Sequence, residues 1–294
     1  MTRVGRTSRS LAWAELLRLP ALFTVPGDAL AGAAAASARP TPRTLLAIGS
    51  SLCLYEAGMA LNDWADREED AVERPHRPLP SGRIRPTAAL AAACAFTGAG
   101  LTLAARAGRP ALAVATPLAA TVWAYDLALK HTPTGPVAMA TARALDLLLG
   151  AAATTSHVRP ALPSAALLAT HTLTVTTVSR QETRGGSPVP ALAALASTAA
   201  LTRLLTGAGP HAPSRARLTT ALAAAYATTV TRPYFHAALN PSPPLTQRAV
   251  GGGIRATIPL QAALAARSGA AGTALLTAAL APIARKFGRK VSVT

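Results

Sequence analysis

The chain has 294 residues, of which 50% are hydrophobic and only 14% are charged, fewer charges than a soluble domain of this length normally carries. The net charge of +17 would suit nucleic-acid binding, but most Arg residues stand between apolar segments and few aromatic residues are available to stack on bases. We therefore expect a membrane protein with no nucleic-acid partner, whose basic residues face lipid headgroups.

Ten apolar stretches follow one another along the chain, and most approach the ~20 residues that cross ~30 Å of hydrocarbon. Many are rich in Ala, Thr and Gly, which favours close helix packing. No long polar segment separates them, so we expect one all-α membrane helix bundle over 1–294, with a basic cytoplasmic arm at 1–10 and a basic tail at 285–294. The stretches are 11–37, 44–64, 87–107, 110–129, 136–156, 161–178, 189–207, 216–236, 249–266 and 269–284.

The N-terminal sequence imitates a secretory signal peptide, because Arg residues precede an apolar run that ends in small residues. Glu15, Arg18 and Asp28 interrupt this run, and apolar segments continue to the far end of the chain. We therefore interpret 11–37 as a first membrane helix. Cys53 and Cys94 stand in apolar segments without a CxxC motif, which indicates small buried residues.

The acidic residues gather in one place, since half of the 12 fall between Asp63 and Glu73. Asn62, Asp66 and Asp70 recur every fourth residue, so on a helix they share one face with about 6 Å of rise per step. Two carboxylates and an amide offer the oxygen ligands that Mg²⁺ prefers, with waters and substrate phosphates as the remaining ligands. Taken alone, the acids are equally typical of a solvated helix end, and Asp63 points away from the row.

A turn sequence follows the acidic row and reads Arg77-Pro78-Leu79-Pro80-Ser81-Gly82-Arg83-Ile84. Its prolines and glycine predict a turn that holds two guanidiniums beside the acids, where they can contact phosphate oxygens that the metal leaves free. NxxxDxxxD followed by RPxPSGRI closely resembles the signature of the UbiA superfamily of membrane prenyltransferases. The joint motif is far more specific than an acidic run.

This resemblance extends to the fourth apolar stretch, where the family places a tyrosine and a lysine near the diphosphate. The corresponding residues here are Tyr125 and Lys130, although a Lys at this place is also typical of a cytoplasmic anchor. Asp126 either orients Lys130 or helps to bind the metal. Arg143 and Asp146 are three residues apart within the fifth stretch, which predicts a structural ion pair lining the cavity.

The sequence departs from the family at the second acidic row, which family members carry between the sixth and seventh helices. Here the chain reads Ser179-Arg180-Gln181-Glu182-Thr183-Arg184, with a single acid. Either Glu182 alone completes a second Mg²⁺ site, or Arg180 and Arg184 neutralise the diphosphate directly. This variant resembles the EboC-like branch of the superfamily, whose acceptors are poorly defined.

The resemblance implies Mg²⁺-dependent transfer of a prenyl group from a prenyl diphosphate to an unidentified acceptor, by a multi-pass inner-membrane enzyme whose site faces the cytoplasm. A non-catalytic UbiA-fold protein, serving in transport or as a lipid-binding scaffold, and a transferase of another isoprenoid-linked group remain alternatives. We expect catalysis by Asp66, Asp70, Lys130 and Glu182, metal binding by Asn62, Asp66, Asp70 and Glu182, and diphosphate binding by Arg77, Arg83, Tyr125, Lys130, Arg180 and Arg184.

The two ends of the chain give conflicting predictions of topology. Arg and Lys residues are more frequent in the connections that would lie inside if the N-terminus is cytoplasmic, and the resemblance implies nine crossings with the C-terminus outside. The basic tail over 285–290 instead favours a cytoplasmic C-terminus. The stretch 249–266 opens with three glycines and contains Arg255 and Gln261, so we expect it to be interfacial or only partly inserted, which leaves about nine crossings.

Overall fold

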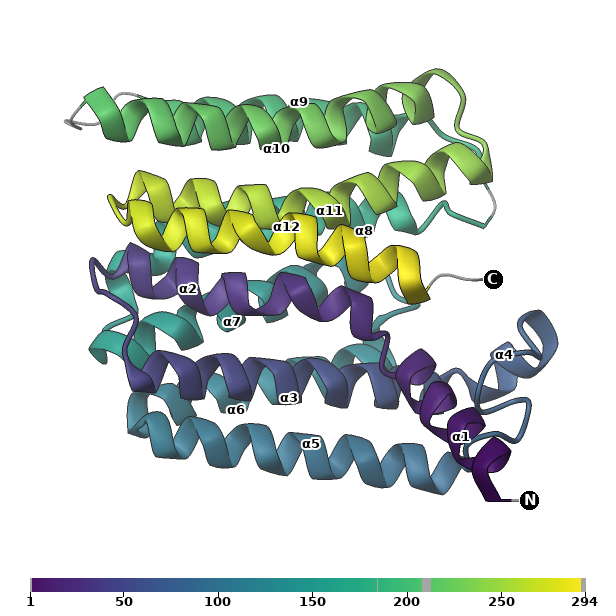
Figure 1. Cartoon of the computed structure of the whole chain (residues 1–294). Helices are drawn as coiled ribbons and strands as arrows, with labels where there is room; N and C mark the ends of the chain where they lie inside the picture. The colour runs from purple at the N-terminus through teal and green to yellow at the C-terminus, as the bar shows by residue number, and fades with distance from the viewer. Residues whose placement is uncertain (1, 184, 208–212, 292–294) are drawn as a thin grey trace.

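The computed structural model describes residues 2–183, 185–207 and 213–291, and every regular element within them is helical. Figure 1 shows α2, α3 and α5 to α12 side by side in one bundle, with α1 and α4 outside it at one end. The elements, with η marking short 3₁₀ or π turns, are α1 (Thr2–Leu16), η1 (Leu19–Thr24), α2 (Val25–Ala35), α3 (Pro42–Ala65), α4 (Arg67–Glu73), α5 (Pro86–Ala107), α6 (Arg109–Ala124), η2 (Tyr125–Leu129), α7 (Gly135–Thr155), η3 (Arg159–Ala161), α8 (Leu162–Ser179), α9 (Val189–Thr206), α10 (Pro213–Leu239), α11 (Pro243–Arg267) and α12 (Ala271–Val291).

The prediction of an all-α membrane-type bundle is confirmed. By length and hydropathy, six of the described helices can cross a membrane: α3, α5, α6 with η2, α7, η3 with α8, and α9. Proline stands in the first two positions of α3, α5, α6, α7, α8, α9 and α11. A proline there removes only an N–H that has no partner within the helix. The prolines that separate the apolar stretches in the sequence therefore also begin the helices.

The first apolar stretch is not the single helix that we predicted over 11–37. The chain breaks between α1 and η1, where Arg18 adopts a left-handed conformation with φ 47°. A non-glycine residue with positive φ cannot continue an α-helix. As a result α1 leaves the bundle obliquely (Figure 1), and only η1 and α2 continue along it.

The stretch 249–266 forms part of α11, and the prediction that it is interfacial or only partly inserted in a membrane stays a prediction. α11 lies within the bundle against α2, α8, α10 and α12, and it is buried along most of its length. Its glycines allow this close packing, because a Cβ added to Gly253 would lie 2.6 Å from Val175 Cγ2 and 2.7 Å from the Tyr234 hydroxyl oxygen. The low hydropathy of α11 therefore reflects contact with protein in place of lipid.

The chain end is also placed differently from the prediction. Nine crossings would leave the C-terminal end opposite the acidic segment, but α12 ends at the same end of the bundle as α4 (Figure 1). This arrangement is the one that an even number of crossings gives, and it agrees with the basic tail. The number of membrane crossings stays a prediction.

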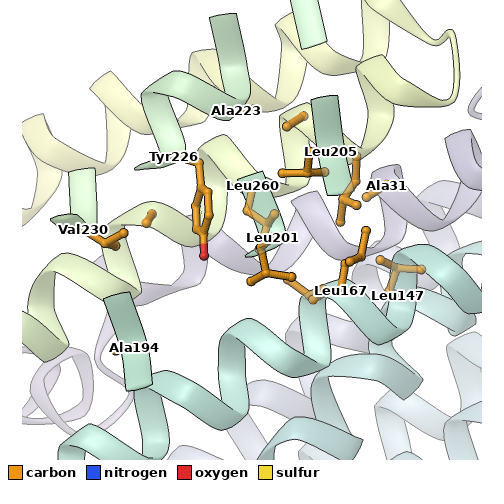
Figure 2. Close-up of a cluster of buried hydrophobic side chains, with 14 of the residues drawn as sticks. Ala31, Leu147, Leu167, Ala194, Leu201, Leu205, Ala223, Tyr226, Val230 and Leu260 are labelled. Carbon is orange, nitrogen blue, oxygen red and sulfur yellow. The ribbon is translucent and has the colours of Figure 1, made fainter. Parts of the chain in front are cut away.

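The core is built largely from Ala and Leu, and Figure 2 shows one such cluster, with Leu201 and Leu260 near Tyr226 and with Leu147 at its far side. Small residues bring backbones together. A Cβ added to Gly150 of α7 would lie only 2.2 Å from the Ala29 carbonyl oxygen of α2. Close backbone approach between helices, which the Ala- and Gly-rich composition predicts, therefore occurs between α2 and α7.

A buried polar cluster joins α2, α7 and α11, and it corrects the predicted pairing of Arg143 with Asp146. Arg143 Nη1 instead donates to Asp28 Oδ2 at 2.6 Å, while the Ser51 hydroxyl donates to Asp146. Gln261 Nε2 donates to Asp28 Oδ1 at 2.6 Å. Charged side chains inside such a bundle are costly unless they find partners, and here the partners come from other helices.

Candidate active site

The acidic segment occupies the junction of α3 and α4 at one end of the bundle (Figure 1). Helical hydrogen bonding continues through it, because the Asp66 N–H donates to the Asn62 carbonyl at 2.9 Å and the Asp70 N–H donates to the Asp66 carbonyl at 2.8 Å. The three residues therefore follow one another turn by turn, as their spacing predicts. Their side chains contact different groups.

Asp66 contacts the lysine that the sequence analysis placed near the diphosphate. Lys130 directly follows η2, a single π-helical turn, and its N–H donates to the Tyr125 carbonyl at 2.9 Å. Such turns are rare within helices and frequent at functional sites. Lys130 Nζ contacts Asp66 Oδ1, and the lysine side chain is only 10% exposed. The structure thus brings these two residues together from separate helices.

Asp70 is buried, and its carboxylate faces guanidinium groups. Arg77 Nη1 donates to Asp70 Oδ2 at 2.8 Å and lies 3.6 Å from Asp63 Oδ1. Arg74 Nη1 lies 3.5 Å from Asp70 Oδ1. Asp70 is therefore neutralised by two arginines, and Arg77 also reaches the neighbouring acid that the sequence analysis ranked lower.

The segment from Arg77 to Ile84 forms the predicted turn. The Ser81 N–H donates to the Arg77 carbonyl at 3.0 Å, and the Ile84 N–H donates to the Pro78 carbonyl at 3.0 Å. Gly82 has φ 73°, a conformation that glycine adopts at little steric cost. This turn fixes the backbone of Arg77 beside α4.

Arg83 contacts α1 and its own turn. Its Nη1 donates to Glu15 Oε2 of α1 at 2.7 Å, its Nη2 donates to the His76 carbonyl at 2.6 Å, and its Nε donates to the Ser81 hydroxyl at 3.0 Å. These bonds hold α1 against the turn. The predicted contact between Arg83 and a diphosphate stays a prediction.

Asn62 connects the acidic segment to two further elements. Its Nδ2 donates to Asp126 Oδ1 of η2 at 3.2 Å. Arg18, at the break after α1, donates from Nη2 to Asn62 Oδ1 at 3.4 Å and to Asp63 Oδ1 at 3.2 Å. Asp126 therefore orients the amide of Asn62 in this structure. The break after α1 places the guanidinium of Arg18 beside Asn62 and Asp63.

The end of α8 lies beside the same group of residues. The Arg180 guanidinium donates to the Thr132 carbonyl, two residues beyond Lys130. Tyr125 is half-buried and close enough to Asp66 and Arg180 to interact with their charges. Tyr125, Lys130 and Arg180 therefore gather at one end of the bundle, as expected.

Glu182 follows α8 and is half-buried. Burial raises the pKa of its carboxyl above the ordinary value, while the positive charge of Arg74 acts to lower it. Because Arg74 also contacts Asp70, it lies between the two acidic motifs. Arg184 is outside the described residues, so its predicted role stays a prediction.

The family model of the UbiA prenyltransferase family matches residues 22–242, which is most of the chain. The chain belongs to this family. The resemblance drawn from the two motifs is therefore confirmed at the level of the family.

Two relatives of this UbiA chain carry the name digeranylgeranylglyceryl phosphate synthase. The chain is 35% identical over 127 residues to the protein of Methanopyrus kandleri. This match covers 42% of this chain and 45% of that relative. It is 40% identical over 89 residues to the protein of Methanothrix thermoacetophila. That match covers 30% of this chain and 33% of that relative. The chain thus spans less than half the length of these relatives.

Solved structures show the same fold. The apo UbiA homolog from Aeropyrum pernix K1 has a TM-score of 0.65 and 21% identity, covering 83% of this chain and 96% of that chain. The UbiA homolog from Archaeoglobus fulgidus bound to GPP and Mg²⁺ has a TM-score of 0.61 and 18% identity. The match covers 89% of this chain and 99% of that chain. At these identities the likeness concerns the fold alone.

Within the described part of this UbiA chain, Asp66, Glu69 and His131 have ligand atoms within 4.8 Å of one another. The two carboxylates fit Mg²⁺, which is held by one or two carboxylates together with waters and phosphate oxygens. The histidine nitrogen is a poorer match for this hard ion. Asp66 belongs to the predicted ligand set, but Asp70 faces arginines instead.

Sequence reasoning missed three residues that the structure places at this site. Glu69 stands three residues after Asp66, so its helical spacing could have marked it, whereas His131 follows Lys130 directly and is 69% exposed. Arg18 belongs to the apolar stretch 11–37, for which the sequence predicts a single helix. No pattern in that stretch indicates that its arginine reaches Asp63.

Proposed function

We propose that this UbiA family member transfers a prenyl group from a prenyl diphosphate to an acceptor in the membrane, with Mg²⁺ as cofactor. The observation that carries the proposal is the contact of Asp66 with Lys130, with Glu69 beside them, in a chain of this family. An acid suited to binding a metal and a cation suited to binding phosphate lie next to each other, at the end of an apolar bundle. The homolog bound to GPP and Mg²⁺ supports this choice of donor and ion.

The residues divide into two groups by charge. Asp66 and Glu69, with Asn62, would hold Mg²⁺, which supplies positive charge to a leaving diphosphate. Lys130, Arg77 and Arg180 would contact the diphosphate oxygens that the ion leaves free. These preorganised cations stabilise the negative charge that grows on the leaving group.

The reaction breaks the bond between the allylic carbon and the diphosphate oxygen. The diphosphate leaves with the bonding electrons, and the allylic carbon forms its new bond with a nucleophilic atom of the acceptor, which loses a proton. The apolar helices keep water away from the reacting carbon. Relatives named digeranylgeranylglyceryl phosphate synthase support a prenylated lipid as product, so we propose an acceptor within the membrane of the cell, reached from a cytoplasm-facing site.

A label-transfer assay tests the proposal. The protein, purified into lipid vesicles, is incubated with Mg²⁺, a series of labelled prenyl diphosphates and a lipid extract. We expect label in a lipid product and free diphosphate, both lost when Mg²⁺ is removed by chelation. Release of neither from any donor would refute the proposed activity.

A non-catalytic role is the second candidate, because one observation favours it. Among the described residues at 179–183, Glu182 is the sole acid, and Asp70 is already neutralised by Arg77 and Arg74. A protein of this kind would bind a prenyl diphosphate without releasing diphosphate. Binding measured beside turnover distinguishes the two candidates.

A further inference from the structure

A basic pocket lies where α1 meets the turn before α5, on the outer side of that turn. It has a volume of about 580 Å³. Its lining includes Arg9 and Trp13 of α1, Arg83 and Arg85 of the turn, and Thr87 of α5, and the described residues give it no acidic lining. Three arginine residues therefore line one open cavity.

Most of this positive charge is not neutralised. Arg83 is paired with Glu15, at 2.7 Å. Arg9 and Arg85 are exposed and form no ion pair with another described residue. The first turn of α5 contains no acidic residue, so the positive end of its helix dipole adds to the charge of the pocket.

The pocket is built on packed elements. Ala12 and Leu16 of α1 are fully buried in a cluster that includes Ala60 of α3 and Ile84 of the turn. Arg83 adds the bonds to Glu15 and His76 that join α1 to the turn. The arginines therefore project from a fixed frame, which lowers the entropic cost of binding an anion.

The place of the pocket favours one class of ligand. α1 leaves the bundle obliquely at the end that carries α4 (Figure 1), so in a bundle of membrane helices it lies at the level of the headgroups. Trp13, half-buried in the wall, is a residue type enriched at that level. Guanidiniums match phosphate oxygens in geometry, and the cytoplasmic leaflet supplies anionic phosphates.

We propose that this pocket binds the phosphate of an anionic lipid headgroup, at a site separate from the one that holds Asp66 and Lys130. The lipid would occupy the space between α1 and α5, with its phosphate at Arg9 and Arg85 and its chains along the bundle. A free phosphate ion shares the same chemistry. The experiment therefore has to distinguish the two sources.

Native mass spectrometry of the full chain tests the assignment. Protein in mixed micelles is offered phosphatidylglycerol or phosphatidylcholine, and retained lipid is counted. We expect the wild type to retain phosphatidylglycerol, and the double variant Arg9→Gln/Arg85→Gln to retain at least about five-fold less. The matched control Arg106→Gln/Arg109→Gln removes the same charge from exposed positions at the other end of α5 and should retain lipid like the wild type.

Equal losses in the two double variants would mean general attraction to charge, and equal retention of phosphatidylcholine would mean that the pocket does not select an anionic headgroup. Either result would overturn the assignment. Inorganic phosphate added at millimolar concentration tests the other source. If it displaces phosphatidylglycerol from the wild type, the ligand is a free phosphate and the lipid assignment fails. The single variant Arg9→Gln repeats the test where the double variant is poorly folded. Binding is measured without donor, so its failure leaves the proposed activity untouched.

Discussion

Replacing Asp66 with Asn removes one negative charge and one metal ligand at nearly constant volume. The carboxylate is 19% exposed, and its partner Lys130 is 10% exposed, so the charge acts in a partly desolvated place. Two unit charges about 4 Å apart interact by about 4 kcal/mol at an effective dielectric constant of about 20. Because the carboxylate is partly exposed, solvent weakens this interaction, and we take about 3 kcal/mol as the interaction with a bound ion that Asp66→Asn loses. A loss of about 3 kcal/mol in the transition state corresponds to about a 100-fold lower rate.

The assay for Asp66→Asn is label transfer at saturating Mg²⁺, with helix content and elution volume as measures of folding. Glu68→Gln is the matched control, because Glu68 belongs to the same segment, is 86% exposed and contacts only Arg67 in the described structure. We expect the control to keep the wild-type rate. If Asp66→Asn keeps more than about a tenth of the rate, less than about 1.4 kcal/mol has been lost and the assignment of Asp66 to the metal is wrong.

Three further changes test other parts of the structure. Arg180→Ala should raise the donor KM several-fold, whereas an unchanged KM together with a loss of kcat in Glu182→Gln would favour a second ion held by Glu182. Gly150→Ala should lower the unfolding temperature and Gly98→Ala should not, because a Cβ meets the Ala29 carbonyl oxygen at 2.2 Å at the first position and nothing within 4 Å at the second. A cytoplasm-dependent reporter fused after Thr294 should be active, since α12 ends beside α4; an inactive reporter would refute an even number of crossings.

Local patterns predicted much of the fold. Pro42 and Pro86 begin α3 and α5 within two residues of the expected stretches, because proline acts through its own backbone and needs no distant partner. The acidic row and the turn before α5 were predictable for the same reason. Four-residue spacing and a glycine with positive φ are properties of the local chain.

The errors have one cause, which is contact between residues far apart in the chain. Arg143 was paired with its helical neighbour Asp146, but its partner is Asp28, 115 residues away. Hydropathy likewise measures suitability for lipid, so it does not show that α11 packs against α2, α8, α10 and α12. The bond of Arg83 to Glu15, 68 residues away, was not predictable for the same reason, while its contact with a diphosphate stays a prediction.

Asp66 contacts Lys130 and Asp70 contacts Arg77, two cations that we propose for diphosphate binding, and the first contact has a consequence for metal binding. Lys130 contacts Asp66 Oδ1, so Mg²⁺ competes with Lys130 for this oxygen, and Lys130 is too buried to be left without an anionic partner at low cost. A diphosphate would offer that partner, so ion and donor should bind together more tightly than either alone.

Lys130→Met tests this coupling without turnover. Removal of the lysine frees Asp66, so the variant should bind Mn²⁺, used as a spectroscopic substitute for Mg²⁺, several-fold more tightly than the wild type when no diphosphate is present. The same variant should lose most of the gain that inorganic diphosphate gives to the wild type. Electron paramagnetic resonance of free Mn²⁺ measures both quantities. Weaker Mn²⁺ binding in Lys130→Met would show that the lysine does not compete with the metal for Asp66.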